Sequence, residues 1–253
     1  MGKSSGLGAG LFVSGNDLSG DIGSLSGING GNTPLIVTGI DKSAVERLGG
    51  LRDGGIAFDA FFNDAAAQAH PVLSALPTAD RIVTYYHRTT TIGDEVASLI
   101  GKQIDYDGTR GNDGSLTFTT QALANGFGLE WGESLTVGKR TDSGATAGGT
   151  LDYGATIGQT LFGAQAYLHV FAFTGTDATI TIEDSTSDFS AVSLMAFTEV
   201  SALGGANTSE RIETASRTET VDRYVRVTTT TSSGFSNLVF AVQVVKNQTS
   251  VVF

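Results

Sequence analysis

The chain contains no cysteine, which excludes disulfide bridges, thiolate nucleophiles and zinc–sulfur sites. Positive charge is scarce: 15 lysines and arginines stand against 26 aspartates and glutamates, a net charge of −11. So acidic a protein cannot collect phosphate contacts, which argues against ordinary nucleic-acid binding. No apolar run approaches the ~20 residues of a membrane-spanning helix, and residues 1–15 contain no sustained apolar stretch. We therefore expect neither membrane insertion nor a signal peptide.

Proline is also rare, with 3 residues, whereas glycine is abundant, with 34. The glycines follow no three-residue period, which excludes collagen. Many glycines between short apolar runs are typical of a β protein with numerous tight turns. A hydrophobic content of 40% is enough for a packed core.

The length predicts one large domain or two ordinary ones. Residues 138–149 are small, polar and rich in glycine, so we predict a linker over residues 139–150. Residues 1–138 then form an N-terminal domain with an N-terminal arm. Residues 151–253 form a C-terminal all-β sandwich, which makes the fold class mainly β.

Alternating apolar residues predict strands in both halves, and one helix in the first. Asn63 or Asp64 caps this flanking α-helix, which runs through Ala65 to Ala69, and Pro71 either kinks it or marks its start. The predicted strands cover residues 55–62, 81–87, 95–105, 116–123 and 129–137, then 166–173, 179–183, 193–198, 210–215, 223–230 and 238–245.

Side chains of the types found in catalytic and metal-binding sites do not form a recognisable site in the sequence. The three histidines are far apart in the sequence, and the carboxylates of residues 105–113 lack the spacing of a calcium loop. Glu130 and Glu133 flank Trp131 as a glycosidase pair could, but nothing else in the sequence supports that reaction. We predict that the chain is not an enzyme and has no cofactor, metal or catalytic residue.

Three segments carry a family resemblance: residues 48–62 (LGGLRDGGIAFDAFF), 70–77 (HPVLSALP) and 126–132 (GFGLEWG). Their order resembles the major tail proteins, or tail tube proteins, of actinobacteriophages with long non-contractile tails. The resemblance covers residues 10–140, and the second half resembles the β-sandwich appendage of some of these proteins.

The resemblance implies a β-sandwich or half-barrel with a flanking helix, six copies of which form a ring that stacks into a tube. The implied protein partners are further copies of the chain and other tail proteins, such as the tape measure and terminator proteins. The resemblance also implies that DNA passes through an acidic lumen without specific binding. The implied location is the tail of a virion, with synthesis in the bacterial host cytoplasm. The N-terminal arm and residues 26–55, which are poor in clear strands, are expected to become ordered on assembly. We assign inter-subunit contacts to Leu11, Phe12, Asp41, Arg47, Leu51, Arg52 and Asp53.

Two alternatives remain open. The C-terminal sandwich could bind host-surface glycans through Tyr153, Tyr167 and Tyr224, although the alternation of the strands predicts that Tyr167 and Tyr224 are core positions. The chain could also be a capsid decoration or tail-terminator protein.

Overall fold

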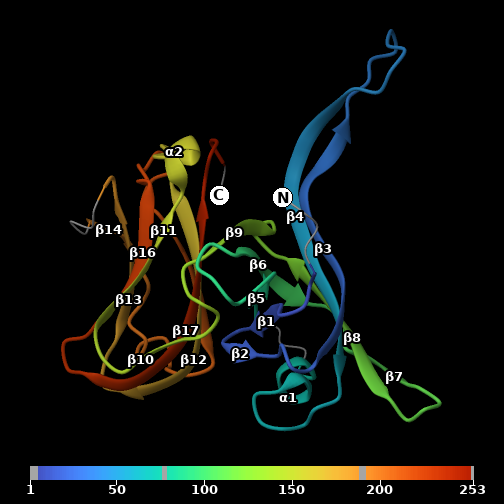
Figure 1. Ribbon diagram of the computed structural model, residues 1–253. Coiled ribbons are helices and arrows are strands. Elements are labelled where there is room, and N and C mark those ends of the chain that lie inside the picture. Colours follow the sequence, from blue (N-terminus) through green and yellow to red (C-terminus); the bar gives the residue numbers. More distant parts are fainter. Residues whose placement is uncertain (1–4, 76–78, 188–191, 252–253) are drawn as a thin grey trace.

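The computed structural model describes residues 5–75, 79–187 and 192–251 of the chain. They form two antiparallel sheets with two short helices, which confirms the predicted mainly β fold. Figure 1 shows two lobes side by side, with strands β1 to β9 in one and β10 to β17 in the other. A long hairpin, made of β3 and β4, projects from the N-terminal lobe.

The N-terminal lobe is a sandwich around one apolar core. Strands β9, β6, β5, β1 and β2 form one layer, and β3, β4, β8 and β7 branch from it through the pairing of β6 with β8. Leu11, Leu99, Ile56 and Phe58 are buried between these layers. The elements are β1 (Gly10–Val13), β2 (Asn16–Asp17), β3 (Ile22–Ile36), β4 (Arg47–Phe61), α1 (Ala69–Leu73), β5 (Arg81–Tyr86), β6 (Glu95–Gln103), β7 (Asp107–Arg110), β8 (Leu116–Ala124) and β9 (Glu130–Ser134).

The C-terminal lobe is a second sandwich with its own core. Strands β15, β12, β17 and β10 face a four-stranded sheet in the order β11–β16–β13–β14. Leu168, Phe240, Val227 and Ile182 are buried between the two sheets. The elements are β10 (Arg140–Asp142), β11 (Thr146–Asp152), α2 (Gly154–Ile157), β12 (Ala164–Gly175), β13 (Thr179–Ser185), β14 (Val192–Ala196), β15 (Thr208–Glu213), β16 (Tyr224–Thr230) and β17 (Phe235–Lys246).

The prediction of a flexible linker over residues 139–150 is wrong, because β10 and β11 lie there and pair with β17 and β16. Arg140 holds the segment in place. Its guanidinium donates to both carboxylate oxygens of Asp142, at 2.8 and 2.7 Å, and to the carbonyl of Val227. A Cβ on Gly148 would lie 2.7 Å from the backbone carbonyl oxygen of Val227. Close packing, and not chain flexibility, therefore explains this glycine.

Of the two predicted positions of the helix, the start near Pro71 is confirmed and the run through residues 65–68 is wrong, because α1 begins at Ala69 and Pro71 lies in its first turn. Proline is tolerated there because the first-turn N–H groups have no partner within the helix. Ala67, just before the helix, has a left-handed φ of 62°. Asp21 accepts a hydrogen bond from the Ala69 N–H at 2.9 Å and so satisfies one of the free donors of α1.

A continuous sheet and a buried interface join the two lobes. Strand β9 pairs with β17, through Ser134 opposite Gln243. A small apolar cluster between the lobes contains Phe12, Tyr86 and Ala241, all buried. The first sheet thus serves both lobes, with one face of β1, β5 and β6 in the N-terminal core and the other against the C-terminal lobe.

In the part of the chain that the structure describes, no helix has the length and apolar character needed to cross a bilayer.

Candidate assembly interface

The β3–β4 hairpin is exposed over the outer part of both of its strands. Each strand has 15 residues, and the register runs from Ile22 opposite Ala60 to Ile36 opposite Arg47. Strand β8 pairs with β4 over Gly55–Phe61, so among the described residues the outer half of β4 has β3 as its one neighbour. The part of β4 that does not pair with β8 is residues 47–54. These eight residues, at ~3.3 Å each, extend the hairpin by roughly 26 Å past β8.

The prediction that residues 26–55 are poor in strands is wrong, and the glycines that suggested it have a packing role. Leu129, from the segment before β9, lies across the base of the hairpin. A Cβ on Gly54 would lie 2.6 Å from the backbone nitrogen of Leu129, and one on Gly30 would lie 3.0 Å from its side chain. Glycine at both positions therefore allows the hairpin to pack against the body of the lobe.

Beyond this base, the hairpin exposes apolar side chains on both of its faces. Leu35 and Leu48 are cross-strand partners on one face, and they are 51% and 58% exposed. Ile36, the next residue, points to the opposite face and is 69% exposed. A hairpin with one face in water usually alternates between polar and apolar residues. Exposed apolar residues on both faces are typical of an interaction surface.

The tip of the hairpin, residues 37–46, exposes apolar side chains beside three charged ones. Val37, Ile40 and Val45 are among the exposed large hydrophobic residues. The Lys42 ammonium lies 3.7 Å from the Asp41 carboxylate and 3.9 Å from that of Glu46. The charges of the tip thus partly neutralise one another, and its apolar side chains face solvent.

An ion-pair cluster at the hairpin base connects β4 to both lobes. The Glu130 carboxylate is buried and accepts from Arg211 Nε at 3.1 Å and from the Tyr167 hydroxyl at 2.5 Å. Arg52 of the hairpin lies 3.5 Å from the same carboxylate. Burial and the adjacent charge of Glu130 raise the pKa of the Tyr167 phenol. The Arg211 guanidinium stacks 3.9 Å from the centre of the Phe127 ring. The cluster holds the hairpin base at a defined place.

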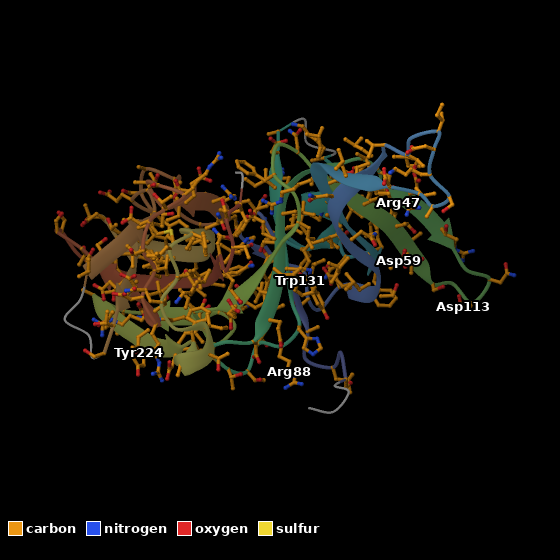
Figure 2. All side chains as sticks on the ribbon, turned by 90° about the horizontal axis from the view of Figure 1, so that it is seen from above. Arg47, Asp59, Arg88, Asp113, Trp131 and Tyr224 are labelled. Atoms are coloured by element: carbon orange, nitrogen blue, oxygen red, sulfur yellow. The ribbon has the colours of Figure 1, made fainter. Side chains whose placement is uncertain are left out.

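Of the seven predicted contact residues, the structure brings five together on the hairpin. Asp41, Arg47, Leu51, Arg52 and Asp53 are exposed there, and Figure 2 shows Arg47 on the same side of the molecule as the projecting hairpin. The assignment of Leu11 and Phe12 is wrong, because both side chains are buried within the subunit, at 3% and 2% exposed. Strand β1 pairs with β5, which places Leu11 in the N-terminal core and Phe12 between the lobes.

The sequence reasoning missed Leu35, Ile36, Ile40 and Leu48. Their signal was an apolar series within a segment too rich in glycine to read as a strand.

Other candidate groups are placed as follows. Asp107 opens β7, and the Asp113 carboxylate accepts from the Ser115 N–H and hydroxyl in the turn between β7 and β8. In the described ranges, no three metal-ligating side chains come together.

Tyr153 and Tyr167, proposed for glycan contact, are buried at 9% and 1% exposed. That alternative therefore loses two of its three aromatic residues.

No family model matches the sequence, and no curated protein matches it. Among solved structures, the chain is similar to the crystal structure of the SPP1 Dit (gp 19.1) protein, described as a paradigm of the hub adsorption apparatus in phages that infect Gram-positive bacteria. The two share 10% identity with a TM-score of 0.33, and the match covers 92% of this chain and 98% of the other. At this level of similarity, the function of the chain has to be argued from its own residues.

Proposed function

We propose that the chain is a structural subunit of a phage tail tube, without enzymatic activity, that assembles into rings and stacks of rings. The single observation that carries the proposal is the β3–β4 hairpin. It projects past the body of the lobe, with apolar side chains on both faces and with strand edges that no described residue pairs. An isolated two-stranded hairpin is at best marginally stable in water, and unpaired edges are templates for pairing with another chain. Burial of the hairpin between copies of the chain stabilises its two strands and gives their free edges a pairing partner.

The face of the sheet that we assign to the tube lumen is the outer face of β3, β4 and β8. Asp59 lies there with Ser24 and Thr119, whose hydroxyls donate to its carboxylate at 2.6 and 2.8 Å. These hydrogen bonds lower the pKa of Asp59, so it is ionised at neutral pH. A hydroxyl-rich, weakly acidic surface repels DNA and offers few contacts to phosphates, which suits the passage of a genome.

The experiment that tests assembly is electron microscopy and size-exclusion chromatography of the purified chain over a range of concentrations. We expect rings or tubes. Leu48→Asp should give monomers, because it places a charge on the face that is enclosed by a neighbour. Leu161→Asp is the matched control, since Leu161 is similarly exposed, at 56%, but lies between α2 and β12.

Circular dichroism checks that both variants keep the β fold. A wild-type chain that stays monomeric at every concentration would contradict the proposal. So would a Leu48→Asp variant that assembles as well as the wild type.

A further inference from the structure

A second apolar surface lies at the opposite end of the hairpin from the tip. It is a groove of about 380 Å³ between residues 6–11 and the start of β3, with Tyr85 of β5 beside them. Among the described residues, its lining contains no aspartate, glutamate, lysine or arginine, and it includes Leu7, Ile22, Leu25 and Tyr85. The side chain of Leu7 is 86% exposed. Such a groove favours aliphatic side chains over charged ligands.

The tip of the same chain cannot fill this groove. Leu25 and Val37 are separated by 12 residues of extended chain, which corresponds to roughly 40 Å. The tip and the groove thus lie at opposite ends of one extended hairpin, and Figure 1 shows the tip far from the strands of the body. The tip of another copy has no such constraint.

The two surfaces are complementary in chemistry. The tip offers Val37, Ile40 and Val45, and Ile40 is fully exposed. The Lys42 ammonium lies near the carboxylates of both Asp41 and Glu46, so it partly neutralises them as the tip approaches the uncharged groove. In the described chain, β3 pairs with β4 alone, so its other edge beside the groove can bond to an incoming backbone.

We propose that the hairpin tip of one copy inserts Ile40 into the groove lined by Leu7, Leu25 and Tyr85 of the next copy. The contact joins two different surfaces, so it is head-to-tail, and repetition produces a closed ring or an open stack. This inference rests on the proposed function, and it adds the identity of the receiving site.

Because the chain has no cysteine, introduced thiols report this contact directly. Ile40→Cys chains are mixed with Leu25→Cys chains that carry a mass tag, and the mixture is oxidised under assembling conditions. A tip seated in the groove brings the two Cβ atoms near the ~4 Å that a disulfide requires. The mixed-disulfide heterodimer should exceed that of an Ile40→Cys and Leu161→Cys mixture by about tenfold, because contact raises the effective thiol concentration.

The outcomes distinguish a failure of the groove as the receiving site from a failure of the proposed tube function. Rings or tubes without preferential cross-linking to Leu25→Cys overturn the groove as the receiving site and leave the tube subunit in place. A protein that never assembles overturns both. As a second measurement, Ile40→Asp should abolish assembly while circular dichroism and melting temperature stay unchanged, and normal assembly of that variant overturns the inference.

Discussion

The backbone N–H of Gly15 donates a hydrogen bond of 3.0 Å to Nδ1 of His169, across 154 residues of sequence and between the two lobes. Since Nδ1 accepts this bond, the neutral ring carries its proton on Nε2, 2.8 Å from the Thr84 hydroxyl. Thr84 lies 2.7 Å from Ser98, which in turn bonds to Gln243. One buried chain of polar groups therefore fixes how the lobes sit against each other.

Replacement of Gly15 should destabilise the whole protein. Its φ of 77° favours glycine, and a Cβ would lie 2.4 Å from the Thr208 nitrogen and 2.6 Å from the Val170 carbonyl oxygen. We expect Gly15→Ala to lower the free energy of unfolding by about 3 kcal/mol or more, since strain and a backbone clash combine. Urea denaturation measures the change. Gly20→Ala is the control, because nothing lies within 4 Å of its added Cβ, and it should stay within about 0.5 kcal/mol of wild type.

Stability should fall on mild acidification because of His169. Burial lowers the pKa of His169 from 6.5 to about 3. Between these values the unfolded chain takes up a proton that the folded protein does not, so stability is lost as the pH falls below 6.5. At pH 5 the loss is about 2 kcal/mol, and above pH 6.5 this contribution is flat.

The test compares unfolding free energies of the wild type and His169→Gln between pH 5 and 7.5. Carboxylates contribute equally to both proteins, so the difference in slope isolates the histidine. Parallel curves would show that His169 does not cause the loss.

The two arginines around Glu130 should differ in their effect on stability. Arg211 is 4% exposed beside a carboxylate that is 2% exposed, whereas Arg52 is 34% exposed. Arg211→Gln leaves a buried carboxylate with the more exposed Arg52 as its remaining cationic partner and should cost about 3 kcal/mol. Arg52→Gln removes a half-exposed pair and should cost less than about 1 kcal/mol. Equal losses in urea denaturation would contradict this division of roles.

Ala67 offers a stabilising substitution. Its φ of 62° is costly for any residue with a Cβ, so Ala67→Gly should raise the free energy of unfolding by about 1 kcal/mol. The neighbouring Ala66 is exposed and has no positive φ, so Ala66→Gly should be neutral or slightly destabilising. Thermal melts of the two variants give the comparison, and a lower melting temperature for Ala67→Gly would count against the strain.

Reversal of charge on the proposed lumen face should make tubes retain DNA. Asp59→Lys replaces an ionised carboxylate with a cation on every subunit, which adds phosphate contacts. We expect duplex DNA to bind these tubes with an affinity that decreases steeply with salt, and not to bind wild-type tubes. Asp113→Lys, at the turn between β7 and β8, is the control. DNA retention that is the same for both variants would place Asp59 elsewhere than in the lumen.

The sequence by itself determined the β character and the position of most strands. Alternation at Phe240, Val242 and Val244 predicted one face of β17, and all three side chains are buried in the C-terminal core. The period of two along a strand is a local property, so it can be read from residues that are neighbours in the chain.

The tertiary structure decided what the glycines and the buried polar groups do. Gly54 and Gly148 read as loop residues, but both lie in strands, and glycine is needed there because backbone atoms of Leu129 and Val227 approach them closely. His169 read as an isolated histidine, and its partners Gly15 and Thr84 come from the other lobe. Such contacts join residues that are 85 to 154 positions apart, so no local pattern encodes them. The apolar hairpin became a candidate interface for the same reason, because exposure of a side chain depends on what the rest of the chain covers.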